Sequence, residues 1–260
     1  MTLLPTDGPS TSGSTAHAGG EIARPPLARA VAIMQPYFCP YVGYFQLMSA
    51  VDLFVVYDNI EYTKKGWINR NRILQGGRDA IISIPLKRDS DFLHVRDRVL
   101  ATDFDRTKLL NRIRESYRRA PFFSQAFPVV EEIVGKQEPN LFGYLLHSLR
   151  RICEYLGIDT PIAVSSSLPV DHGLRGQEKV LALCRHLGAS LYVNAIGGVE
   201  LYSREAFLDR GIELKFLRPR PFEYRQFGES FVPWLSIVDV MMFNSAADVR
   251  RVLRSQYDLV

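Results

Sequence analysis

Residues 30–58 read AVAIMQPYFCPYVGYFQLMSAVDLFVVYD, and this stretch decides the fold class. The apolar run 30–34 predicts a buried parallel strand, and the two prolines in the segment after it force a non-helical loop. Residues 43–50 suit a short helix, and residues 52–58 form a second β-branched and aromatic run that ends in an acid. A strand, a loop, a helix and a strand within about 30 residues predict a βαβ unit.

Outward from this stretch, predicted strands and helices alternate along the sequence. Further strands are predicted at 80–85, 162–165, 191–194 and 212–217. Helices are predicted at 106–119, 125–135, 140–156, 177–187, 203–210, 237–243 and 246–254. The pattern predicts an α/β fold with a mainly parallel, Rossmann-like sheet flanked by helices. We expect a single domain over residues 28–260, with a helical insertion at about 104–156.

Composition excludes several classes of protein. Of the 260 residues, 47% are hydrophobic and 23% are charged, which is enough apolar material for a core and excludes a wholly disordered or collagen-like chain. No run approaches the roughly 20 apolar residues that span a bilayer, so no membrane span is predicted. Residues 1–27 are rich in Ser, Thr, Gly and Pro and lack the features of a signal peptide. They predict a disordered tail on a cytoplasmic protein.

The cysteines argue against a disulfide framework and against a zinc site. Cys39, Cys153 and Cys184 are widely spaced and form no CxxC pair, which fits a reducing compartment. Cys39 alone falls in a predicted ligand-side loop, next to a helix N-terminus, and is a candidate nucleophile if its pKa is lowered there. No other cluster has the spacing of metal ligands, so neither a metal nor a cofactor is predicted.

The net charge of +4 conceals a local excess of positive charge. Residues 61–120 contain 15 Lys and Arg against 8 Asp and Glu, so this segment carries +7. Arginine supplies 25 of the 32 cationic side chains, and its planar guanidinium suits two-point binding of phosphate or carboxylate. The segment is interpreted either as a solvated charged face or as a site for an anionic ligand.

Ligands of open α/β sheets bind at the carboxyl ends of the strands. Three polar or glycine-rich segments, 35–43, 58–72 and 194–202, follow predicted strands. The candidate substrate- or anion-binding residues within them are Gln35, Tyr37, Lys64, Trp67, Arg70, Asn71, Arg72 and Asn194. For residues 67–72 the alternative is a structural network that closes the loop.

Three residues are candidates for the catalytic step. Asp58 ends a predicted strand, Asn69 lies in the polar segment after it, and His172 lies in a loop beside Asp171. Asp58 or His172 would act as a general base, and Asn69 would orient the reacting group of a substrate. The alternative for His172 is a capping or surface role. Lys179, in the first turn of the next helix, is expected to face the same loop.

Four stretches carry a resemblance to a known family. They are MQPYFCPYVGYFQLMSAVDLFVVYDNIEYTKKGWINRNRI at 34–73, LPVDHGLRGQEKVLALCRHLGASLYVNAIGGVELY at 168–202, GIELKFL at 211–217 and FVPWLSIVDVMMFN at 231–244. From Val31 to Asn244 the sequence resembles the WbqC-like protein family, whose members occur in bacterial polysaccharide and specialised-metabolite gene clusters. The resemblance implies a transferase that moves an acyl or aminoacyl group to an amine, such as an amino-sugar.

The sequence is therefore consistent with two classes of function. The first is this transferase, with a small-molecule or sugar substrate and an anionic donor, for which an aminoacyl-tRNA or a carrier-bound donor would serve. The second is a noncatalytic module that binds nucleic acid or a carrier through the positively charged segment, with Tyr62, Trp67 and Tyr117 interleaved among its cations. The sequence predicts no oligomeric state.

Overall fold

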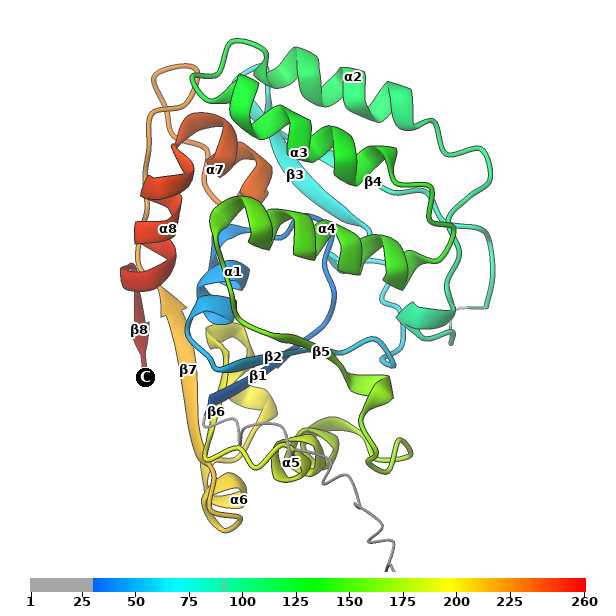
Figure 1. Ribbon diagram of the computed structural model, residues 1–260, viewed down its shortest axis with the longest axis vertical. Coiled ribbons are helices and arrows are strands. Elements are labelled where there is room, and N and C mark those ends of the chain that lie inside the picture. Colours follow the sequence, from blue (N-terminus) through cyan, green and yellow to red (C-terminus); the bar gives the residue numbers. More distant parts are fainter. Residues whose placement is uncertain (1–29, 91) are drawn as a thin grey trace, which may run out of the picture.

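The central sheet has six strands in the order β5-β2-β1-β6-β7-β8 in the computed structural model, which describes residues 30–90 and 92–260 (Figure 1). The predicted tail at 1–27 lies outside the described residues. The strands are β1 (Ala30–Met34), β2 (Leu53–Val56), β5 (Ile162–Val164), β6 (Leu191–Ala195), β7 (Glu213–Pro219) and β8 (Tyr257–Leu259). All pairs are parallel except β7 with β8. The predicted α/β fold with a mainly parallel sheet is confirmed.

Strand β1 is apolar on both faces because helices cover both faces of the sheet (Figure 1). Successive side chains of a strand point to opposite faces, so Ala32 packs in one core and Val31 in the other. The first core includes the helices α1 (Val42–Ser49), α4 (Leu141–Leu156), α7 (Ile237–Phe243) and α8 (Ala246–Ser255). The second includes α5 (Gly176–His186) and α6 (Arg204–Leu208).

The strand order reverses beside β1, and this reversal locates the expected ligand side. The chain passes from β1 outward to β2 and β5, then returns to lay β6 on the other side of β1 and continues to β7. Strands β1 and β6 are paired only at Ala30–Leu191 and Val31–Tyr192, near their first residues. The carboxyl ends of β1 and β6 therefore flank the topological switch point, where open α/β sheets bind ligands.

The predicted strand at 80–85 does not join this sheet. It forms β4 (Arg78–Ser83), which pairs antiparallel with β3 (Arg70–Gln75) in a separate hairpin. The segment now assigned to β3 was predicted to be a loop after the second strand. Gly76 and Gly77 both have positive φ angles, 60° and 76°, as a two-residue hairpin turn requires. Strand β8 was also missed, because it is short and lies at the sheet edge.

The predicted helical insertion consists of α2 (Arg106–Tyr117), α3 (Phe123–Gly135) and α4 (Figure 1). Hydrogen bonds to Asp239 of α7, which is fully buried, link this insertion to the rest of the protein. The Asp239 carboxylate accepts hydrogen bonds from the hydroxyls of Tyr117 (2.7 Å) and Tyr224 (2.6 Å) and from Nε2 of Gln226 (2.8 Å). Burial raises the pKa of Asp239, and these three hydrogen bonds oppose the shift.

Among the residues that the structure describes, no helix is long and apolar enough to cross a membrane.

Replacement of Tyr117 by Phe is expected to lower the free energy of unfolding by about 1–3 kcal/mol. The Tyr117 hydroxyl accepts from the backbone N–H of Leu74 (2.8 Å) as well as donating to Asp239, so its loss leaves buried groups unpaired. Tyr155→Phe is the matched control, because the buried Tyr155 hydroxyl has no hydrogen-bond partner among the described residues. Denaturant unfolding measures the free energy of unfolding of both variants. An equal loss in the two variants would contradict the expectation.

All three cysteines are expected to be unreactive in the folded protein. Cys39, Cys153 and Cys184 are buried, and burial raises the pKa of each thiol to about 12. Only about 10⁻⁴ of such a thiol is ionised at pH 8, which argues against Cys39 as a thiolate nucleophile. A chromogenic aromatic disulfide should therefore titrate three thiols only after denaturation. A thiol that reacts rapidly in the native protein would overturn this expectation.

Candidate functional site

Polar side chains line the carboxyl edge of the sheet in the order of its strands. Ser165 and Ser166 follow β5, Asp58 follows β2, Gln35 follows β1, and Asn194 lies near the end of β6. This edge brings together five residues predicted from the sequence: Gln35, Tyr37, Asp58, His172 and Asn194. Parallel strands place their carboxyl ends on one edge, which is why residues distant in the sequence meet here.

The carboxylate of Asp58 accepts hydrogen bonds from neighbouring serines of the protein. It is 2% exposed, and its Oδ1 accepts from the hydroxyl of Ser165 and from the backbone N–H of Ser166, both at 2.9 Å. Its Oδ2 accepts from the Ser166 hydroxyl at 2.6 Å. These bonds fix the 3₁₀ turn Ser165–Ser167 against the end of β2. The geometry gives Asp58 a positioning function at the edge, with its oxygens turned to the serines.

His172 is exposed and is held through one ring nitrogen. Its Nδ1 lies 2.7 Å from Nζ of Lys179 and 2.9 Å from Nδ2 of Asn59. Lys179 is 1% exposed and also donates to the backbone carbonyl of Asp171 at 2.8 Å. Burial lowers the pKa of Lys179, and the charge of Asp171 opposes this shift. The expectation that Lys179 faces the His172 loop is met by these contacts.

Asn194 and the glycine turn after β6 fit tightly together. The Asn194 Oδ1 accepts from the backbone N–H of Ala195 at 2.8 Å. Its Nδ2 lies so close to Gly198 that a Cβ atom there would be 2.6 Å away, so this position requires glycine. On the other side of the switch point, Tyr37 donates its hydroxyl to Oε1 of Gln35 at 3.3 Å, and burial raises the pKa of Tyr37.

The segment 67–72 makes a separate network at the base of the hairpin. Asn71 is 5% exposed and donates to the backbone carbonyls of Phe38 (3.0 Å) and Cys39 (2.8 Å). Arg70 donates to the carbonyls of Gly66 and Lys65, and it lies 5.8 Å from the ring of Trp67.

Arg72 has internal partners as well. It pairs with Asp79 at 3.2 Å, donates to the carbonyl of Trp234 at 3.1 Å, and lies 5.5 Å from the ring of Trp67. The guanidinium groups of Arg70 and Arg72 thus serve contacts within the protein. Trp67 itself is 41% exposed, so one aromatic surface at this network is open to a partner.

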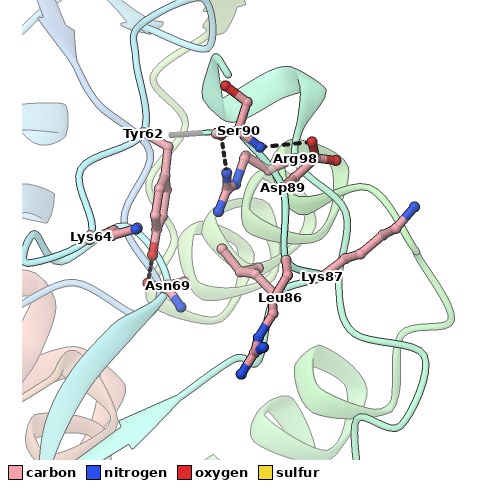
Figure 2. A pocket seen from close by; sticks show the side chains of 9 residues that line it. Tyr62, Lys64, Asn69, Leu86, Lys87, Asp89, Ser90 and Arg98 are labelled. Atoms are coloured by element: carbon pink, nitrogen blue, oxygen red, sulfur yellow. Dashed lines mark hydrogen bonds between the residues drawn. The ribbon is translucent and has the colours of Figure 1, made fainter. Parts of the chain in front are cut away.

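A pocket of about 630 Å³ lies on the other side of the same polar segment (Figure 2). Its lining comes from the segment after β2 and from the segment after β4. The lining residues are Tyr62, Lys64, Asn69, Leu86, Lys87, Arg88, Asp89, Ser90 and Arg98. Lys64 and Asn69 are therefore the two predicted site residues that line it.

Backbone hydrogen bonds fix the two walls of the pocket to each other. The N–H of Tyr62 donates to the carbonyl of Leu93 (3.0 Å), and the N–H of Val95 donates to the carbonyl of Ile60 (2.9 Å). On the opposite wall, Asn69 exchanges two bonds of 2.7 Å with the backbone of Ile84. The Tyr62 hydroxyl donates to Oδ1 of Asn69 at 2.8 Å, which orients the amide at the pocket surface (Figure 2).

Arg98 gives the pocket its electrostatic character. The side chain is 5% exposed, lies 4.5 Å from the ring of Tyr62, and donates one hydrogen bond, to the carbonyl of Ser90 (Figure 2). Its Nε has no hydrogen-bond partner, and no carboxylate among the described residues lies within ion-pair distance of Arg98. With Lys64, Lys87 and Arg88, the described residues that line the pocket include four cations and one acid, Asp89. A buried, unpaired guanidinium is costly unless an anion binds it.

Tyr62 stays a neutral hydrogen-bond donor in this setting. Burial raises its pKa, and the positive charges of Arg98, Arg70 and Lys64 oppose the shift. Arg98, Lys87 and Arg88 were missed as site residues, because the charged run 87–98 shows no spacing that distinguishes a binding wall from a solvated face. In the described part of the chain, no three His, Cys, Asp or Glu side chains gather closely enough to hold a metal ion.

Comparisons with known proteins agree with the resemblance carried by the sequence. The sequence profile of the WbqC-like protein family matches residues 35–251. The chain is also 30% identical over 227 residues to the uncharacterized protein Rv1507c of Mycobacterium tuberculosis (strain ATCC 25618 / H37Rv), an alignment that covers 86% of this chain and 97% of that protein. No solved structure is significantly similar to the chain. Because both matches span most of its length, the protein belongs to the WbqC-like protein family.

Proposed function

We propose that the protein is a transferase that binds the anionic part of a donor in the pocket around Arg98 and moves an acyl or aminoacyl group to an amine. The observation that carries the proposal is the buried guanidinium of Arg98, which has no carboxylate of the described residues within ion-pair distance, in a pocket whose described lining holds four cations and one acid. A volume of about 630 Å³ suits a small-molecule group, since ligand pockets measure about 300–1,000 Å³.

Phosphate or carboxylate is the ligand chemistry that suits this lining. The planar guanidinium of Arg98 offers donors in a fixed plane, and Lys87 and Arg88 add charges from the adjacent wall. Asn69 adds a neutral donor, because its Nδ2 carries two protons and gives one hydrogen bond to Ile84. A carrier-bound or tRNA-borne acyl group brings a phosphate with it, so either donor class fits the proposal.

The transfer step is assigned to the sheet edge next to the pocket. In this step the amine nitrogen attacks the carbonyl carbon, the amine proton leaves to solvent, and the donor departs with the electron pair of the broken bond. His172 would contact the carbonyl group, and Asp58 would fix the serine turn beside it, while Asn69 holds the donor in the pocket. Gln35, Tyr37 and Asn194 would contact the acceptor at the switch point.

Family membership supports the class of acceptor, because the resemblance implies an amine such as an amino-sugar. The proposal assigns the protein to the cytoplasm, where three unpaired cysteines are stable.

Arg98→Met is expected to weaken the binding of inorganic pyrophosphate about tenfold or more, since hydrogen bonds to charged groups contribute about 1.5–3 kcal/mol each. Isothermal titration calorimetry measures the affinity. Arg118→Met is the control, because Arg118 is an exposed arginine of the α2–α3 connection and its loss changes the net charge equally. Lys87→Met, at the pocket wall, provides a second variant if Arg98→Met is poorly folded. Unchanged affinity in both pocket variants would refute the assignment of the pocket.

A second candidate function follows from the aromatic surface at the base of the hairpin. Trp67 is 41% exposed and lies within 6 Å of two arginines, as in proteins that stack single-stranded bases. This arrangement favours the noncatalytic module that binds nucleic acid or a carrier.

If that module is correct, affinity for a single-stranded oligonucleotide should fall about tenfold or more between about 50 and 200 mM salt. Trp67→Ala should weaken binding, whereas Trp234→Ala should leave it unchanged, because no arginine of the described residues lies over the ring of the exposed Trp234. Fluorescence anisotropy measures the affinity for the oligonucleotide at each salt concentration and for each variant. Absence of binding at low salt would exclude this candidate.

A further inference from the structure

We propose that Lys179 is a positioning residue that holds His172 in the tautomer with its proton on Nε2, so that His172 acts as a hydrogen-bond donor to the substrate. The substrate part of this inference rests on the proposed transferase function. The tautomer rests only on the contacts of Lys179, His172 and Asn59. The sequence-based role of His172 as a base is thereby replaced by a donor role.

The first contact is that between Lys179 and His172. Lys179 lies in the first turn of α5 and is 1% exposed, with Nζ 2.7 Å from Nδ1 of His172. A charged ammonium group only donates hydrogen bonds, so Nδ1 must accept. A neutral imidazole carries one proton, and that proton is then on Nε2.

Asn59 directs a second donor to the same ring nitrogen. Its Nδ2 lies 2.9 Å from Nδ1 of His172, and its Oδ1 accepts from the hydroxyl of Ser165. The Ser165 hydroxyl also contacts the buried carboxylate of Asp58. A chain of contacts therefore runs from the end of β2 to His172, and it fixes the orientation of the ring as well as its proton.

The burial of Lys179 is not explained by an ion pair. No carboxylate among the described residues lies within ion-pair distance of its ammonium group, which contacts a backbone carbonyl and an imidazole. Burying a cation without a counterion is costly, and such groups cluster at functional sites. A lysine needed only for packing could be replaced by an apolar side chain at lower cost.

The tautomer decides what His172 does in the transfer. Since Nδ1 is occupied within the protein, Nε2 is the ring nitrogen left for a ligand at the exposed edge. When the amine nitrogen bonds to the carbonyl carbon, negative charge develops on the carbonyl oxygen, and the Nε2 proton donates a hydrogen bond to it. The amine proton leaves to solvent water, because Nε2 already carries a proton. The oxygen then re-forms the double bond as the donor departs with its electron pair.

The tautomer is measured by long-range ¹H–¹⁵N correlation spectra of the ¹⁵N-labelled full-length protein without substrate, at a pH where the imidazole is neutral. His172→Gln assigns the signal by its disappearance. We expect His172 to show a protonated Nε2 and an unprotonated Nδ1. In Lys179→Met the signals should shift toward the Nδ1-protonated form. Lys215→Met, which removes a half-buried lysine of β7 that pairs with Glu213, should leave the signals unchanged.

A wild-type protein with the proton on Nδ1 would overturn the proposal, because Lys179 would then be a neutral acceptor and Nε2 a base. Signals that are the same in the wild type and in a folded Lys179→Met would also overturn it. Pyrophosphate binding is measured separately on the same variant and should stay within about twofold of the wild type, since Lys179 does not line the Arg98 pocket. If the wild-type protein does not bind pyrophosphate, that result counts against the proposed function but not against the tautomer of His172.

Discussion

The side-chain amide of Asn71 is the contact on which the arrangement of the candidate site depends. It donates to the carbonyls of Phe38 and Cys39, which ties the loop after β1 to strand β3 of the hairpin. The Ser236 hydroxyl donates to the same Cys39 carbonyl at 2.7 Å and adds the segment before α7. Cys39 has a φ of 42°, a left-handed backbone that these bonds retain. Together with the N–H of Phe38, which donates to the carbonyl of Ile68 at 3.0 Å, they hold the loop that carries Gln35 and Tyr37 against the base of the hairpin.

The segment 58–62 then connects the two parts of the site. It begins at Asp58, whose carboxylate organises the sheet edge, and ends at Tyr62, whose hydroxyl orients Asn69 in the pocket. Its backbone pairs with residues 93–96 through bonds from Val95 and Arg96. Because a hydrogen-bonded segment of five residues connects them, the pocket around Arg98 and the edge residues keep a fixed distance from each other. A donor held by its anionic end would thus present its other end to the same edge.

Several features of the site were beyond the reach of sequence reasoning for physical reasons. The positive charge of residues 61–120 is visible in the sequence, but the direction of each side chain depends on tertiary contacts. Arg70 and Arg72 are half-buried and donate to carbonyls at the base of the hairpin, whereas Arg98 is buried beside Tyr62 with no carboxylate of the described residues in ion-pair distance. The hairpin was half predicted, since a strand was expected at 80–85 but the polar residues at 58–72 suggested a loop. Burial of Ile73 and Leu74 against the helices makes that segment a strand.

The sequence by itself determined the α/β class, the βαβ opening and the family, because apolar periodicity and a long motif are local properties of the chain. It also located the polar residues at the strand ends. Only the tertiary structure decided which of them share a site. It separated Lys64 and Asn69 in the pocket from Arg70 and Arg72 in the hairpin, and it showed which atoms of Lys179 and His172 meet. Which side chains lie together depends on how segments distant in the sequence pack against each other, and no single position of the sequence specifies that packing.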